Sequence, residues 1–112
     1  MISLLQSFAM HAQGQEHLKP LLPKQERAVS FRFGGESCTI RLSQQGITVS
    51  EGEESVEVVT VQQEEDLQKL LAGAVRMQPL LRRKGMVYTG TYRTLLLLES
   101  LFYVSQPLEQ GA

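Results

Sequence analysis

The sequence predicts one α+β domain, with a five-stranded, mostly antiparallel sheet and helices packed on one face. Three observations predict this class. Apolar residues have helical spacing in the first 13 residues, alternate with a period of two from about residue 28, and return to helical spacing after residue 64. At 112 residues, of which 42% are hydrophobic and 21% charged, the chain is long enough to bury one core.

The first 27 residues divide into a helix and a connector. Residues 1–13 repeat apolar side chains at spacings of three and four, which is typical of an amphipathic helix. Residues 14–27 read as a connector, because Pro20 and Pro23 fix their own φ and disfavour helix in the residue before them. The core is then expected over residues 28–104, with a flexible tail over residues 105–112.

Four strands are expected next, joined as a meander. Apolar and polar residues alternate on both sides of Gly34-Gly35, which predicts a hairpin. Gln45-Gly46 leads into a short third strand, and the fourth is expected over residues 55–61. In that strand Val56 and Val58 would face one way and Val59 and Val61 the other, which indicates that part of the strand is covered on both sides.

The rest of the core is mostly helical. Three acidic residues at positions 64–66 precede leucines at helical spacing, which predicts a helix that ends at Gly73. A single turn at Gln78-Pro79 and a short strand over residues 85–90 follow. Residues 92–104 then predict a last helix with a wide apolar stripe.

Several of these features together resemble the sterol carrier protein 2 (SCP2-like) family. They are Leu70-Leu71 followed by Gly73, then Pro79, Lys84-Gly85, a strand that ends at Gly90, and an apolar last helix. The strands that lead into an acidic helix start are similar as well, so the resemblance covers about residues 28–104. It implies a tunnel or cavity between sheet and helices for a sterol, fatty acyl or prenyl ligand. It also implies that the protein acts as a lipid carrier, or as an accessory domain that holds an apolar substrate or assists dimerisation.

The run of four leucines at residues 95–98 is the centre of the expected site. Four consecutive leucines cover more than the stripe of about 100° with which a helix faces one core. Some of them therefore face a ligand cavity, a dimer partner or the N-terminal helix. Each candidate taken singly is also compatible with an ordinary core. The candidate ligand-binding residues are Phe31, Phe33, Leu67, Leu71, Met77, Leu81, Met86, Tyr88, Leu95, Leu98, Leu101 and Phe102.

Charges are segregated along the chain. Residues 51–66 hold seven acidic side chains and no basic one, and residues 67–98 hold six basic side chains and no acidic one. The basic segment could attract an anionic headgroup or a membrane surface through Arg82, Arg83 and Lys84. The favoured interpretation is a solvated rim whose charges pair with the acidic segment, since exposed ion pairs are common.

Other classes of function receive no support from the sequence. A net charge of −1 argues against nucleic acid as a partner. His11, His17 and Cys38 form no metal or nucleophile arrangement, so neither a cofactor nor enzyme activity is expected. The lone Cys38 is expected to be a buried thiol in a reducing compartment.

The expected function is therefore binding or carrying an apolar, lipid-like molecule. The alternative is a non-enzymatic dimerisation or accessory domain that uses the same apolar surface, and a homodimer is an expected partner state. No positive charge precedes the first apolar residues, and the longest apolar run is far below the ~20 residues of a membrane span. Cytoplasmic residence is expected.

Overall fold

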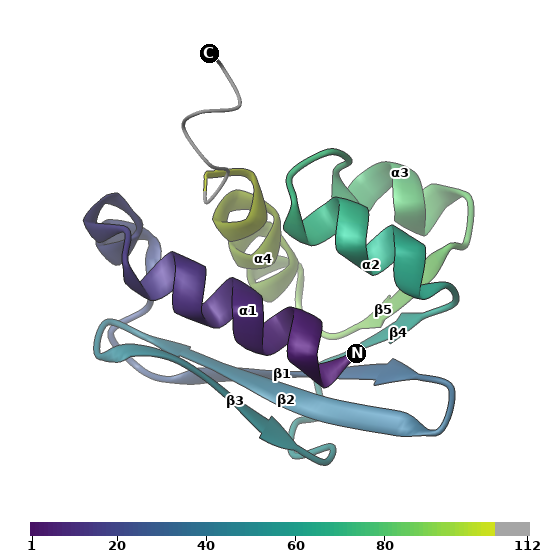
Figure 1. The fold of residues 1–112 in the computed structure, drawn as a ribbon, viewed down its shortest axis with the longest axis horizontal. Helices are drawn as coiled ribbons and strands as arrows, with labels where there is room; N and C mark the ends of the chain where they lie inside the picture. The colour runs from purple at the N-terminus through teal and green to yellow at the C-terminus, as the bar shows by residue number, and fades with distance from the viewer. Residues whose placement is uncertain (105–112) are drawn as a thin grey trace.

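The computed structural model describes residues 1–104 and shows a five-stranded sheet with helices over one of its faces (Figure 1). The predicted α+β class and the mostly antiparallel sheet are confirmed. The flexible tail predicted for residues 105–112 lies outside the described residues. The strands are β1 Arg27–Phe33, β2 Glu36–Ser43, β3 Gly46–Glu51, β4 Val58–Val61 and β5 Met86–Thr89.

The strand order is β3-β2-β1-β4-β5, so the predicted meander is wrong at one step. The chain leaves β3 at one edge of the sheet, crosses to the other side of β1, and there β4 pairs parallel with β1. The three remaining pairings are antiparallel, as predicted. A parallel neighbour needs a crossover connection, and residues 52–57, named here the crossing loop, provide it.

The crossing loop also explains why the predicted fourth strand is too long. The strand begins at Val58, and Val56 is 90% exposed. The prediction that part of this strand is covered on both sides is confirmed, because Val58 and Val59 point to opposite faces of the sheet and both are buried.

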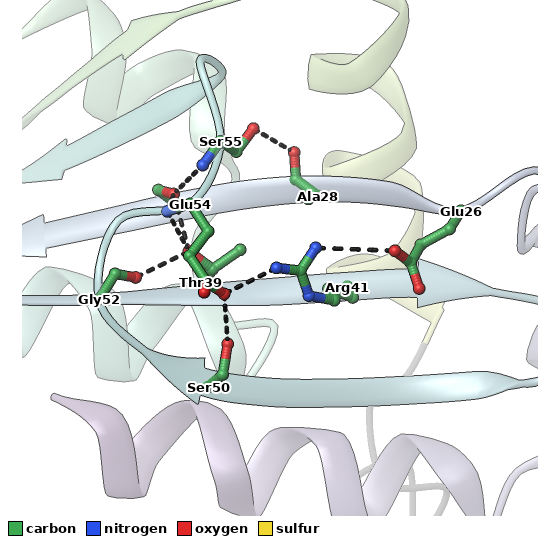
Figure 2. Close-up of polar contacts among 9 residues, drawn as sticks. Glu26, Ala28, Thr39, Arg41, Ser50, Gly52, Glu54 and Ser55 are labelled. Carbon is green, nitrogen blue, oxygen red and sulfur yellow. Dashed lines mark hydrogen bonds and ion pairs between the residues drawn. The ribbon is translucent and has the colours of Figure 1, made fainter.

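Hydroxyl groups on the helix-free face of the sheet hold the crossing loop in place (Figure 2). The Thr39 hydroxyl donates to the carbonyl of Gly52 at 2.8 Å and accepts the backbone N–H of Glu54 at 2.9 Å. The Ser30 oxygen accepts the N–H groups of Glu54 and Ser55. These N–H groups are satisfied by side chains rather than by a sheet ladder, which a sequence pattern of alternating valines does not reveal.

The helices are α1 Ile2–Gln13, the short 3₁₀ helix η1 Glu16–Leu21, α2 Glu64–Leu71, α3 Met77–Arg82 and α4 Tyr92–Val104. The first and last helices match the predicted ranges. The expected connector contains η1, and α3 stands where a single turn was expected. Pro79 is tolerated in α3 because the first N–H groups of a helix have no acceptor within it.

The core lies between the sheet and the helix layer (Figure 1). Side chains at alternating positions of the strands meet those of the helices, and Phe8 of α1 packs edge-to-face on Phe102 of α4 with ring centroids 5.1 Å apart. Cys38 is fully buried on β2, as predicted, and this burial raises the pKa of its thiol. The thiol is therefore a packing group rather than a nucleophile.

Candidate functional site

The structure brings the twelve candidate residues together in one apolar layer. Four of them, Phe33, Leu71, Leu81 and Tyr88, are partly buried and pack against the rest. Two other candidates, Met77 and Phe102, line a void of only about 10 Å³, so side chains nearly fill the space there. The fully or almost fully buried candidates are Phe31, Leu67, Met77, Met86, Leu95, Leu98, Leu101 and Phe102.

The small void lies at the seam between the helices. Met77 and Phe102 line it together with residues of α2 and of the loop that follows α2. Met77, which lines the void, and Met86 on β5 are both buried. Methionine side chains are flexible and adapt to irregular spaces, so this part of the core can be rearranged at a lower energetic cost than a cluster of branched residues.

The leucine run at 95–98 is divided between inside and outside. Leu95 and Leu98 are buried, Leu97 is partly buried, and Leu96 is 43% exposed. Leu96 therefore does not face the sheet, and whether a ligand, a dimer partner or the N-terminal helix meets the run stays a prediction.

A pocket of about 260 Å³ lies elsewhere, where the end of α1, η1 and the turn from β2 to β3 meet. None of the twelve candidates lines it. Its polar wall is rich in carboxamides, and Gln13 donates a hydrogen bond to the carbonyl of Ile47 across it. No periodic sequence pattern marks this pocket, because its walls come from three separate segments of the chain. The concentration of glutamines in these segments is the sequence feature that could have indicated it. The lining residues are Ala12, Gln13, Gln15, Glu16, Leu18, Lys19, Leu22, Gln44, Gln45, Gly46 and Ile47.

The floor of this pocket belongs to the main core. Ala12, Leu18, Leu22 and Ile47 are buried members of the same apolar cluster as the candidate residues. Between the pocket and α4 stands η1, which approaches α4 closely. His17 of η1 also donates to the carbonyl of Val104 at 3.3 Å. The 3₁₀ helix thus lines the pocket and also contacts α4.

A cluster of polar side chains anchors the first turn of α4. The Glu57 carboxylate accepts bonds of 2.9 Å from the N–H of Thr91, the hydroxyl of Thr91 and the hydroxyl of Thr94. The Tyr88 hydroxyl lies 3.3 Å from Glu57, and Arg27 donates to Thr94. The sequence predicted Tyr88 as a ligand contact and did not single out the other members of this α4 anchor, because nothing in the pattern links a loop glutamate to a helix start.

The α4 anchor shifts the ionisation of two of its members. Burial of the Glu57 carboxylate raises its pKa, but the bonds from Thr91, Thr94 and Tyr88 outweigh burial, and the net pKa lies below the usual value. Burial, followed by the charge of Glu57, raises the pKa of Tyr88. Both groups therefore keep the protonation states that suit a structural anchor.

The basic residues are only partly paired. Arg82, Arg83 and Lys84 are exposed, and Arg83 reaches the buried carboxylate of Asp66 at 2.8 Å. Lys69 pairs with Glu65, so the predicted pairing with the acidic segment holds for two basic residues. Two glutamates of the crossing loop instead pair with arginines of β1 and β2, Glu53 with Arg32 and Glu54 with Arg41.

Within residues 1–104 no cluster of three or more His, Cys, Asp or Glu could hold a metal ion. None of the helices in that range has the length and apolar character to cross a bilayer. Both histidines are exposed.

The solved structures that resemble this protein, described below, are SCP2-domain proteins. No protein-family model matches the chain, and no curated protein matches it. An SCP2 ubiquinone synthesis protein, UbiJ, has 16% identity and a TM-score of 0.67, with 93% of this chain and 86% of that chain covered. A crystal structure of sterol carrier protein 2 has 16% identity and a TM-score of 0.63, with 95% of each chain covered. Palmitated SCP2L2 from Aedes aegypti has 13% identity and a TM-score of 0.64, with 89% and 91% covered. The chain therefore has the fold of the SCP2 domains, as the sequence resemblance implied.

Proposed function

We propose that this protein binds or carries an apolar, lipid-like molecule between the sheet and the helix layer, without catalysis. The observation that carries the proposal is the continuity of the core with the 260 Å³ pocket, whose floor is made of core residues. A ligand that displaces η1 passes from the pocket directly into the space under α4. The twelve candidate residues would form the wall of that space.

Two further observations support this proposal. The flexible side chains of Met77 and Met86 occupy the interior that a ligand would take. The neighbour of like fold from Aedes aegypti is described as palmitated and another neighbour is a sterol carrier protein, which supports a lipid-like ligand for this protein. Affinity would come from buried apolar area, at about 25 cal/mol per Å², with few polar contacts to orient the ligand.

The methionines provide a direct test. With ¹³C-labelled methionine methyl groups, palmitate, cholesterol and farnesol are titrated separately and NMR spectra are recorded. Binding under α4 shifts the signals of Met77 and Met86, which are buried, and leaves Met10 unchanged, since its side chain is 77% exposed on α1. A ligand that changes no methionine signal except that of Met10 is on the surface, and the proposal is then wrong.

The entry route has its own test. Ala12 lies in the pocket wall and Met10 lies on the outer face of the same helix, so Ala12→Phe narrows the pocket and Met10→Phe is the matched control. Ala12→Phe should slow palmitate uptake at least tenfold if the route passes η1, whereas Met10→Phe should leave it unchanged. Equal uptake by both variants would place the entrance elsewhere.

The second candidate function is non-enzymatic dimerisation or accessory binding through the same apolar surface. The exposure of Leu96, in contrast to Leu95 and Leu98, favours a role for the outside of α4 in contacts with another molecule. Light scattering at several protein concentrations tests for a homodimer. Cytoplasmic residence stays a prediction, which fractionation of expressing cells would check.

A further inference from the structure

The pocket beside η1 can hold one end of a long-chain molecule. Its volume of about 260 Å³ lies below the range of about 300–1,000 Å³ that encloses a whole drug-sized ligand. Ala12, Leu18, Leu22 and Ile47 form its apolar floor and belong to the main core. The chain of such a molecule would run along this floor toward α4, and its polar end would stay at the carboxamide wall.

Two carboxamides of that wall have their nitrogen atoms engaged by the protein. The side chain of Gln13 donates to the carbonyl of Ile47, and the amide nitrogen of Gln15 donates to Nε2 of His11. An amide nitrogen only donates, and an amide oxygen only accepts. Gln15 lines the pocket, and its side-chain oxygen is buried. The polar atoms that Gln13 and Gln15 offer to a ligand are therefore their oxygens, which are acceptors.

The charges around the pocket cancel. Glu16 and Lys19 are the two charged residues that line it within the described part of the chain, and both are exposed. A carboxylate or phosphate would lose hydration and face carboxamide oxygens, and burial of such a charge without a partner is costly. A hydroxyl group is uncharged and donates one hydrogen bond, which matches a wall of acceptors.

We propose that Gln13 and Gln15 select ligands whose polar end is an uncharged hydroxyl donor, so that long-chain alcohols bind in preference to fatty acids. This rests on the proposed function, because the pocket selects a polar end only if the chain passes under α4. It adds two specificity-determining residues, and neither belongs to the twelve candidates from the sequence.

Three ligands with the same length of chain test the selection. Hexadecanol donates a hydrogen bond, methyl palmitate is uncharged but has no donor, and palmitate is charged at pH 8. Their affinities are measured from the ¹³C methyl signals of Met77 and Met86, which are buried. Hexadecanol should bind about tenfold more tightly than either of the others, which is the effect of about one hydrogen bond. Methyl palmitate separates the loss of the donor from the presence of the charge.

Variants of the two glutamines assign the selection to its residues. Gln15→Leu and Gln13→Leu each remove an acceptor, so each should weaken hexadecanol binding and leave methyl palmitate binding unchanged. Gln15→Glu keeps acceptor oxygens and should weaken palmitate binding further. Gln6→Leu is the matched control, because Gln6 is exposed on α1 and does not line the pocket. Circular dichroism should show all variants folded.

The outcomes separate this inference from the proposed function. If the three ligands shift the methionine signals with equal affinity, the proposed function stands and selection by Gln13 and Gln15 is overturned. Selection is also overturned if Gln15→Leu and Gln13→Leu change hexadecanol binding no more than Gln6→Leu does. If none of the three ligands shifts Met77 or Met86, the proposed function itself is wrong, and the inference falls with it.

Discussion

Ser30 and Thr39 lie opposite each other on β1 and β2, with their hydroxyl oxygens 2.9 Å apart beneath the crossing loop. Thr39 gives its one proton to the Gly52 carbonyl, so Ser30 is the donor between the two hydroxyls. Both side chains are fully buried. The polar pair, not an apolar contact, therefore holds the connection that makes β4 parallel to β1.

Removal of this pair should destabilise the whole fold. Thr39→Val leaves the carbonyl of Gly52 without its hydroxyl donor, and loss of one partner from a buried bond costs about 1–3 kcal/mol. The free energy of unfolding from urea titration should fall by that amount, while Thr48→Val, at an exposed position of β3, should change it by less than about 0.5 kcal/mol. In a double-mutant cycle, Ser30→Ala and Thr39→Val should be non-additive. Additive losses would show that the two hydroxyls act separately.

Gly90 should not accept a side chain. A Cβ there would lie 2.8 Å from Cζ of Tyr88 and 3.0 Å from the Glu57 carboxylate, and the φ of +154° is unfavourable for other residues. Gly90→Ala should therefore lower the free energy of unfolding by about 1–3 kcal/mol and loosen the start of α4. Gly35→Ala, where a Cβ meets nothing within 4 Å, is the control and should be nearly neutral in thermal unfolding.

The α4 anchor predicts a pH dependence of stability. The folded-state pKa of Glu57 is lowered, so its contribution is present above about pH 4.5 and is lost as the pH falls through the folded-state value. Glu57→Gln should cost about 1 kcal/mol at pH 7, because the amide replaces a charged acceptor, and the difference from the unmodified protein should shrink below pH 4.5. Urea unfolding at pH 7 and pH 3.5 measures both values. Glu26→Gln, in an exposed ion pair with Arg41, should show no comparable cost at either pH.

The sequence was sufficient for the local elements and for the class of fold. Helical spacing predicted α1 and α4 with nearly their final bounds, and the alternation around Gly34-Gly35 predicted the β1–β2 hairpin. These patterns report contacts between residues close in the chain. The parallel pairing of β4 with β1 depends instead on hydroxyl groups 9 to 25 residues away from their partners, which spacing does not encode.

The candidate site was predictable only as an apolar layer. Periodicity predicts which side chains point inward, and the twelve candidates do meet there. It does not tell whether facing side chains close the space, because closure depends on the distance between the sheet and α4. The pocket beside η1 and the α4 anchor were missed for a related reason, since each combines residues from separate turns.

Leu96 and Leu98, two residues apart on α4, should respond very differently to truncation. Leu98 is fully buried and Leu96 faces solvent, although both belong to the same run of leucines. Leu98→Ala should cost about 2–5 kcal/mol, from the lost apolar burial and the cavity that remains. Leu96→Ala should cost less than about 1 kcal/mol, because the residue is already 43% exposed and its loss leaves no enclosed cavity. Thermal and urea unfolding of the two variants would check this. Similar losses would mean that Leu96 packs against another molecule in solution, such as a second copy of this protein.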